Sequence, residues 1–173
     1  DEILGNFDKV NIDDRSEIDY EVELAVVIGK EAKNIKKEEV NDYIFGYSIF
    51  NDISDRNLQK KHDQWFLGKS VDSFSAMGPC IVTKNDINDP HNLDISLKIN
   101  DEIRQSSNTS KMFYKVSDLI YELAKHLTLK PGDIIITGTP SGVGMGFNPP
   151  KYLKKGDTID CYIEKIGNLR NSI

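Results

Sequence analysis

The clearest hydrophobic pattern in the chain is a strict alternation of apolar and polar residues, which predicts half-buried β-strands. It runs over residues 93–100 and again over residues 158–164. Residues 103–105 extend the first of these segments across an Asn–Asp pair that favours a hairpin turn. We therefore expect antiparallel strands that bury one face and expose the other.

Other segments are rich in β-branched and aromatic residues and predict buried strands. Residues 19–30 and 43–50 are of this kind, and residues 134–137 form a shorter run. Residues 80–83 form a further strand after a Gly–Pro turn. The sequence thus predicts a domain that is mostly β.

Apolar residues fall at helical spacing over residues 112–128, which predicts one amphipathic helix. Shorter helices are expected within residues 30–40 and 53–61. Residues 65–75 have the Ser and Gly content of a loop, and their three large aromatic side chains predict that this loop packs against the domain. The expected fold class is α+β, mainly β with a few helices.

Length and composition predict a single globular domain over residues 1–173, because 38% hydrophobic residues suffice for a core. The net charge of -6 and the scattered lysines argue against a nucleic-acid partner, which clustered cations would bind. No apolar run reaches the roughly 18 residues that span a bilayer, and no basic leader precedes one, so no membrane partner and a cytoplasmic location are expected. Cys80 and Cys161 lie alone in strand-like segments, which favours core packing over a zinc site or disulfide.

Candidate chemistry begins in the strand predicted over residues 19–30. Glu21 and Glu23 are two positions apart, so they point to the same face with Cβ atoms roughly 7 Å apart. At an effective dielectric constant of about 20, two carboxylates about 4 Å apart repel by roughly 4 kcal/mol, so their convergence requires a proton or a cation. A hard divalent cation takes such oxygen ligands. The alternative is a solvated strand face with two ordinary glutamates.

A glycine-rich segment, residues 138–146, follows the strand predicted over residues 134–137. It lacks the Gly–Lys–Ser/Thr ending and the Gly-x-Gly-x-x-Gly spacing of phosphate-binding loops, so we reject a nucleotide site. Its glycines let the backbone and Thr139 approach a ligand closely.

Five segments of the chain form a pattern together. They are Tyr-Glu-Val-Glu-Leu-Ala-Val-Val-Ile-Gly-Lys (20–30), Asn-Asp-Ile-Ser-Asp-Arg-Asn-Leu-Gln (51–59), Gly-Lys-Ser (68–70), Met-Gly-Pro (77–79) and Thr-Gly-Thr-Pro-Ser-Gly-Val-Gly (137–144). Over nearly the whole chain, and in this order, they resemble the motifs of the fumarylacetoacetate hydrolase family. The resemblance implies the mixed β-sandwich or roll of the family's C-terminal catalytic domain. It also implies a Mg²⁺ or Mn²⁺ ion, with Ca²⁺ as a further option, a homodimer, and 2-oxo or 1,3-diketo acid substrates.

The resemblance assigns roles to residues that match the family's motifs. Glu21, Glu23 and Asp52 match its metal ligands, which agrees with the shared face of the two glutamates. Arg56 and Gln59 match an Arg-x-x-Gln that follows the ligand aspartate; they would share a helix face.

The remaining assignments concern substrate binding and catalysis. The resemblance implies that Arg56 holds a substrate carboxylate bidentately, with Gln59 beside it. It implies that Lys69 stabilises an enolate oxygen as it develops, and that Thr139 contacts the substrate. The alternative is that Arg56 and Lys69 are solvated surface charges and that Gln59 is an incidental helix residue.

One feature of the family is missing from the sequence. Its hydrolytic and decarboxylating members carry a His and a nearby Glu on an N-terminal lid segment that activates water, and no such pair precedes Glu21. His62, His91 and His126 lie elsewhere; surface or structural roles are expected, and His62 is the one expected nearest the site. We expect either that a lid segment belongs upstream of Asp1 or that another group is the general base.

The leading functional hypothesis is a metal-dependent hydrolase that cleaves a C–C bond in an acylpyruvate or a fumarylacetoacetate-like acid through a metal-stabilised enolate. The first alternative is a decarboxylase or isomerase of an oxo-diacid, as in aromatic catabolism, because both reactions pass through the same enolate. A sugar-acid dehydratase comes third. A metal-binding domain without turnover is the alternative from another class.

Overall fold

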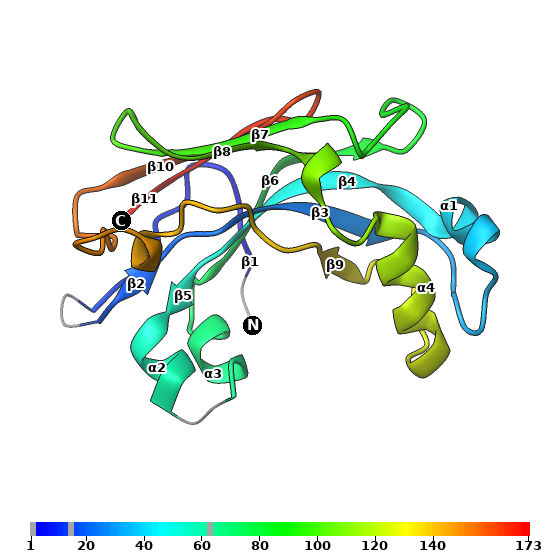
Figure 1. Cartoon of the computed structure of the whole chain (residues 1–173), viewed down its shortest axis with the longest axis horizontal. Helices are drawn as coiled ribbons and strands as arrows, with labels where there is room; N and C mark the ends of the chain where they lie inside the picture. The colour runs from blue at the N-terminus through cyan, green and yellow to red at the C-terminus, as the bar shows by residue number, and fades with distance from the viewer. Residues whose placement is uncertain (1–2, 14–15, 62–63) are drawn as a thin grey trace.

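The computed structural model describes residues 3–13, 16–61 and 64–173, and its strands form two larger sheets that stack face to face (Figure 1). The first sheet has the order β1-β6-β4-β3-β9 and the second the order β11-β10-β7-β8. The first contains β1 (Ile3–Leu4), β6 (Ser75–Thr83), β4 (Ile44–Asp52), β3 (Val22–Ile28) and β9 (Ile134–Ile136). The second contains β11 (Gly167–Ser172), β10 (Thr158–Ile163), β7 (Asp94–Ile99) and β8 (Glu102–Asn108). The predicted mainly β fold of the sandwich type is confirmed.

β3 is an interior strand of the first sheet and pairs antiparallel with β4 on one side and with β9 on the other. All seven of its residues are buried. Its apolar side chains belong to the hydrophobic core, whereas Glu23 brings a carboxylate into the same buried strand. Because burying an isolated charge is costly, Glu23 marks this strand as functional.

The second sheet follows the predicted alternation. Ile95, Leu97 and Ile99 of β7 are buried and pair with the buried Ile163, Cys161 and Ile159 of β10. The turn between β7 and β8 is the predicted Asn100–Asp101 pair, which has φ values of 48° and 65°. Asn and Asp tolerate this left-handed region better than most residues, which is why they occur in hairpin turns.

The α-helices lie beside and below the first sheet in the view of Figure 1. The predicted long helix is α4 (Val116–His126), and the shorter ones are η1 (Lys37–Glu39), α1 (Val40–Tyr43) and α2 (Arg56–Lys61). A helix was expected over residues 53–61, but Ser54 and Asp55 form the short strand β5 (Ser54–Asp55), which pairs with β2 (Ile18–Asp19). The Asp55 side chain accepts hydrogen bonds from the backbone N–H groups of Asn57 and Leu58, so α2 begins directly after Asp55.

Three predictions of local structure were wrong in part. Residues 65–75 contain the short helix α3 (Phe66–Lys69), and one of their three aromatic side chains packs against the domain: Phe74 is buried, whereas Trp65 and Phe66 are 68% and 76% exposed. The strand β9 is only partly buried, because it lies at the edge of its sheet. Cys161 is buried as expected, but Cys80 is exposed.

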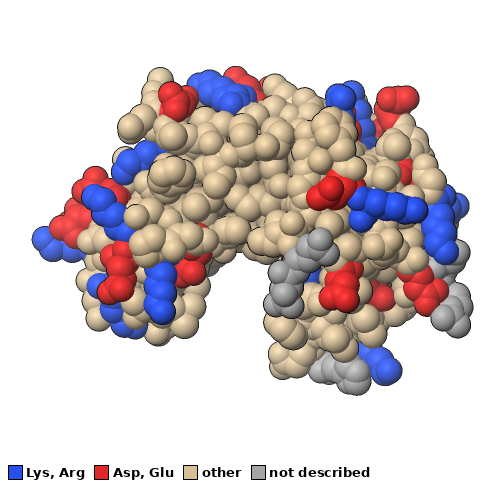
Figure 2. Space-filling view, turned by 180° about the vertical axis from the view of Figure 1, so that it is seen from behind, with Lys and Arg blue, Asp and Glu red and all other residues tan. Residues whose placement is uncertain are grey.

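The helices α2, α3 and α4 form two lobes below the first sheet in the view of Figure 1. α2 and α3 lie together on one side of the molecule and α4 on the other (Figure 1). The space-filling view shows a notch between these two lobes (Figure 2). Within the described part of the chain, no helix is long and apolar enough to cross a membrane.

Candidate metal centre and active site

Three buried carboxylates converge where β3 begins and β4 ends. Glu21 directly precedes β3, Glu23 lies within it, and Asp52 is the last residue of β4. The antiparallel register pairs Val22 with Asn51, which brings the three side chains to one place. One carboxylate oxygen from each residue lies within 4.8 Å of the others. The structure therefore brings together the three residues that were expected as metal ligands.

Two cations neutralise part of this cluster. The Lys69 ammonium donates to Glu21 Oε2 at 2.6 Å and to Asp52 Oδ2 at 2.5 Å. The Nη2 group of Arg56 donates to Glu21 Oε1 at 2.5 Å. Burial lowers the pKa of Lys69, but its hydrogen bonds to Asp52 and Glu21 outweigh burial and raise that pKa above its usual value. Lys69 is therefore a permanent ammonium beside the carboxylates.

Glu23 has a different environment. Its Oε2 accepts a hydrogen bond from the backbone N–H of Gly138 at 2.6 Å, and among the described residues no Lys, Arg or His forms an ion pair with it. Burial, followed by the nearby charges of Asp52 and Glu21, raises the pKa of Glu23 to about 7. Glu23 is thus the member of the cluster that most needs a further cation.

Asp19, which the sequence analysis did not single out, is a fourth buried carboxylate at the site. Its Oδ2 accepts hydrogen bonds from Arg56 Nε and from the backbone N–H of Met145, both at 3.0 Å. Its Oδ1 accepts from the backbone N–H of Gly144 at 2.5 Å. A Cβ at position 144 would lie 2.8 Å from that oxygen and 2.4 Å from the carbonyl of Lys151, so only glycine fits this approach.

The charges of the cluster fit a divalent ion. Four buried carboxylates (Asp19, Glu21, Glu23 and Asp52) and two cations (Arg56 and Lys69) leave a formal charge of minus two. The donors of the expected site are carboxylate oxygens alone, which suits Mg²⁺, Mn²⁺ or Ca²⁺ better than a soft metal. The residues present therefore fit the implied cofactor.

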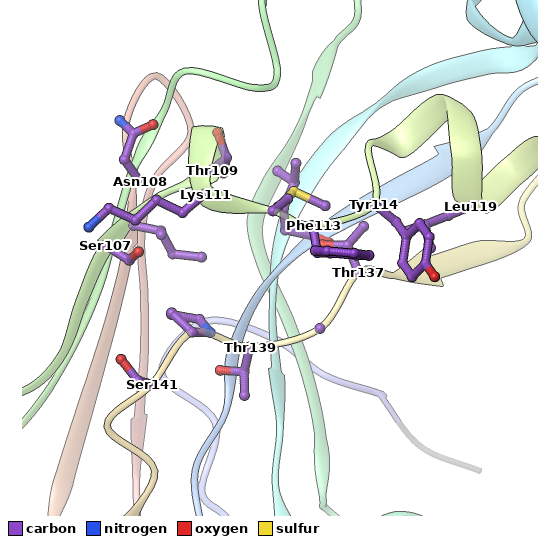
Figure 3. A pocket seen from close by; sticks show the side chains of 15 residues that line it. Ser107, Asn108, Thr109, Lys111, Phe113, Tyr114, Leu119, Thr137, Thr139 and Ser141 are labelled. Atoms are coloured by element: carbon purple, nitrogen blue, oxygen red, sulfur yellow. The ribbon is translucent and has the colours of Figure 1, made fainter.

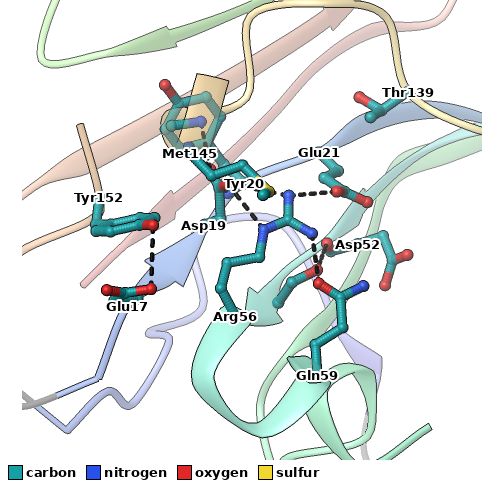
Figure 4. Close-up of polar contacts among 12 residues, drawn as sticks. Glu17, Asp19, Tyr20, Glu21, Asp52, Arg56, Gln59, Thr139, Met145 and Tyr152 are labelled. Atoms are coloured by element: carbon teal, nitrogen blue, oxygen red, sulfur yellow. Dashed lines mark hydrogen bonds and ion pairs between the residues drawn. The ribbon is translucent and has the colours of Figure 1, made fainter. Parts of the chain in front are cut away.

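Arg56 and Gln59 share one face of α2, as their spacing predicts, and Arg56 Nη1 donates to Gln59 Oε1 at 2.9 Å (Figure 4). All three guanidinium nitrogens of Arg56 thus donate to protein acceptors, namely Asp19, Gln59 and Glu21. This arrangement differs from the expected bidentate contact with substrate. Arg56 is also almost fully buried, so the alternative of a solvated surface charge is wrong.

Thr139 is held along the first sheet by its own hydroxyl. Its Oγ1 donates to the carbonyl of Val22 at 2.9 Å and accepts from Gln105 Nε2 at 2.8 Å. Gln105 is buried in β8, and it also accepts from the N–H of Val22 and donates to the carbonyl of Pro140. The Thr139 side chain therefore fixes the path of the glycine-rich loop, and Gln105, which no motif in the sequence marks, supports it.

The glycine-rich loop separates two depressions. One, of about 430 Å³, borders the carboxylate cluster at Glu21 and is lined by Glu21, Arg56, Gln59, Lys60, Trp65, Lys69 and Met145. The other, of about 410 Å³, is lined by residues 137–141 of the loop and by residues of β8 and the segment before α4 (Figure 3).

The histidines do not contribute to either depression within the described residues. His126 is exposed at the end of α4, where it lies 3.4 Å from Glu122, and His91 lies in the turn before β7. His62, the histidine expected nearest the site, lies outside the described residues.

Comparison with known proteins agrees with the fold. Oxaloacetate tautomerase YisK of Bacillus subtilis is 50% identical over 169 residues, which are 98% of this chain and 56% of that protein. The structure of fumarylacetoacetate hydrolase (EaFAH) from Exiguobacterium antarcticum aligns with a TM-score of 0.96 at 43% identity and covers 99% of this chain and 62% of that one. That of 2-hydroxyhepta-2,4-diene-1,7-dioate isomerase from Mycobacterium marinum aligns with a TM-score of 0.89 at 36% identity, over 98% and 64% of the two chains.

The chain spans little more than half the length of the curated relatives it matches. The sequence profile described as "Fumarylacetoacetate (FAA) hydrolase C-terminal" matches residues 1–173. Since this match covers every residue, and the carboxylate cluster lies where the family motifs predicted it, the chain belongs to the fumarylacetoacetate hydrolase family.

Proposed function

We propose that the chain carries the active site of a divalent-metal-dependent tautomerase or isomerase of 2-oxo-diacids, with Glu21, Glu23 and Asp52 as metal ligands. The observation that carries this proposal is that these three carboxylates are buried together. With the neighbouring Asp19, Arg56 and Lys69 included, the cluster has a formal charge of minus two. The relatives named tautomerase and isomerase support the reaction class. The substrate would be a small 2-oxo acid with a second carboxylate, such as oxaloacetate.

The chemistry is the movement of a proton between carbon 3 and the keto oxygen of the substrate. When bound, Mg²⁺ or Mn²⁺ would supply a Lewis acid that favours negative charge on that oxygen. Lys69 remains protonated, and its ammonium group donates to Glu21 and Asp52. From this position the positive charge stabilises the enolate oxygen. Arg56 holds Glu21 in place by donating a hydrogen bond to it, and Gln59 orients Arg56 by accepting a second one.

The group that removes the proton from carbon 3 is not assigned. Among the described residues that line the depression, Glu21 is the one carboxylate and there is no histidine. The lid segment with a His and a Glu upstream of Asp1 therefore stays a prediction, as does the single catalytic domain over residues 1–173.

The C–C hydrolase that the sequence analysis placed first is now the second candidate. The name of the Exiguobacterium relative favours it. The tautomerase with 50% identity favours proton transfer alone, which needs the same enolate but no activated water. The metal-binding domain without turnover remains the alternative from another class, and the same assays distinguish it from the first two candidates.

The test is to follow three reactions of the purified chain with Mg²⁺. They are conversion of enol-oxaloacetate to the keto form by ultraviolet absorbance, pyruvate release from oxaloacetate, and cleavage of acetylpyruvate. We expect the first reaction to depend on Mg²⁺ and to exceed the other two. Glu23→Gln, which keeps the side-chain shape but removes a charged ligand, should lose Mg²⁺ binding in calorimetry together with the activity. Faster cleavage of acetylpyruvate than ketonisation would overturn the proposal in favour of the hydrolase.

A further inference from the structure

The depression at the site contains a third cation, Lys60, whose environment differs from those of the other two. Arg56 and Lys69 are largely buried and paired with the carboxylate cluster. Lys60 lies on α2, one position after Gln59, and its side chain is 58% exposed. Among the described residues that line the depression, Lys60 is therefore the cation that does not contact a carboxylate of the cluster.

The ion pair that Lys60 forms within the described part of the chain is weak. Its Nζ lies 3.6 Å from Glu17 Oε2, and the Glu17 side chain is 41% exposed. Exposed pairs of this kind contribute little to stability, so Lys60 can exchange its partner at low cost. Glu17 also accepts a hydrogen bond from the Tyr152 hydroxyl at 3.1 Å, so it keeps a partner when Lys60 moves (Figure 4).

The walls of the depression leave a path from the cluster to Lys60. Trp65 and Met145 line it together with Lys60, and both side chains are exposed. A substrate that places its 2-oxo acid end at Glu21 and Lys69 would extend between these side chains. If that substrate is a diacid, its second carboxylate needs a cation, and Arg56 already donates from all three of its nitrogens to protein acceptors.

We propose that Lys60 is a specificity-determining residue that binds the second carboxylate of a 2-oxo-diacid, with Trp65 and Met145 forming the walls of this subsite. The inference rests on the proposed function for the identity of the substrate. It adds a residue outside the family motifs and states which end of the substrate that residue contacts.

The test compares a diacid with its monoacid counterpart. Oxaloacetate and 2-oxobutyrate have the same four-carbon chain and 2-oxo acid end, but 2-oxobutyrate lacks the second carboxylate. A charge-assisted hydrogen bond at a partly exposed site predicts that Lys60→Gln raises KM for oxaloacetate about tenfold with kcat little changed. The inhibition constant of 2-oxobutyrate against oxaloacetate should change less than about twofold. Lys60→Arg should restore most of the affinity for the diacid.

Lys61 provides the matched control, because it is the next residue of α2, is exposed, and does not line the depression. Lys61→Gln should leave both values unchanged. An equal loss for the diacid and the monoacid in Lys60→Gln, or the same effect from Lys61→Gln, would overturn the proposal.

The proposed function and this inference can fail separately. If the wild-type chain does not convert oxaloacetate, the proposed reaction is wrong, and calorimetric binding of the two acids in the presence of Mg²⁺ still tests Lys60. Tighter binding of oxaloacetate than of 2-oxobutyrate that is lost in Lys60→Gln supports the subsite. Indifference of both acids to the substitution overturns it.

Discussion

The four buried carboxylates of the site are neutralised in different ways. Glu21 contacts both Arg56 and Lys69, and Asp52 contacts Lys69. Asp19 combines Arg56 with two backbone N–H groups of the glycine-rich loop. Glu23 accepts one hydrogen bond, from the backbone N–H of Gly138, and has no ion pair among the described residues, and burial raises its pKa to about 7. A cation that enters the cluster therefore changes the state of Glu23 most.

The first prediction concerns the pH dependence of metal binding. Because Glu23 binds a proton below its pKa of about 7, Mg²⁺ must displace that proton. We expect the affinity for Mg²⁺ to be constant above pH 7 and to fall by up to about tenfold for each pH unit below it. Titration calorimetry over this range measures the effect, and Glu23→Gln should abolish binding at every pH. An affinity that does not change between pH 5.5 and 7 would contradict the assignment of Glu23 as a ligand.

The raised pKa of Glu23 also predicts how the stability of the metal-free chain depends on pH. The pKa of Glu23 is raised from 4.5 to about 7 on folding, so the folded state binds the proton more tightly than the unfolded state does. The contribution of Glu23 to the free energy of unfolding is therefore full below about pH 4.5 and is lost as the pH rises towards 7. Denaturant unfolding in the presence of a chelator should show this decline, and Glu23→Gln should remove it.

At the level of elements, the sequence predicts best where periodicity alone decides the structure. The alternation in β7 and β10 predicted strands with one buried face, and the two-residue spacing of Glu21 and Glu23 predicted a shared face. In contrast, β11 reads Gly-Asn-Leu-Arg-Asn-Ser and was not predicted. Its strand conformation depends on pairing with β10, which is a tertiary contact that no local pattern encodes.

The same limit applies to the site. The family motifs identified Arg56 and Thr139 as site residues. The hydrogen-bond partners that orient these two side chains, however, come from distant parts of the sequence. Asp19 turns Arg56 inward, and Gln105 of β8 holds Thr139 along the first sheet. The sequence thus identified the residues that gather at the site, whereas their partners required the structure.

The next prediction concerns the contact between α2 and α3. Gly68 of α3 is buried, and a Cβ there would lie 2.8 Å from the carbonyl of Asp55 and 2.8 Å from the backbone N of Gln59. Since both are backbone atoms, Gly68→Ala must push the two helices apart, at a cost of about 1–3 kcal/mol in the free energy of unfolding. Lys69 follows Gly68 directly, so its contacts with Glu21 and Asp52 should loosen as well.

Denaturant unfolding and Mg²⁺-dependent turnover of the Gly68→Ala chain measure these two effects. Gly132→Ala is the control for an added methyl group, because no atom lies within 4 Å of a Cβ at that position, although its φ of 93° will cost some stability. We expect Gly68→Ala to lower kcat and Gly132→Ala to leave it unchanged. Unchanged kcat and stability in Gly68→Ala would show that α3 does not depend on this close approach.

At the level of the whole molecule, large apolar side chains remain exposed just before α4 and on β9. Phe113 and Tyr114, just before α4, pack edge to face with ring centroids 4.9 Å apart, and Phe113 is 89% exposed. Tyr114 and Leu119 line two adjacent depressions of about 410 and 590 Å³, and the second also contains the exposed Ile136 of β9. Contiguous apolar surface of this kind is uncommon on monomers and typical of interfaces.

The last prediction is that a second copy of the chain covers this surface. The homodimer was expected from the family resemblance, and we expect its interface at the exposed residues Phe113, Tyr114 and Ile136. Sedimentation equilibrium at micromolar concentration should show a dimer, and Phe113→Ser should weaken it at least about tenfold because the anchor of the apolar surface is lost. Phe7→Ser removes an aromatic side chain that is also highly exposed but lines neither of these depressions, so it should leave the dimer intact. A wild-type monomer at this concentration would contradict the dimer itself, whereas equal effects of the two substitutions would place its interface elsewhere on the molecule.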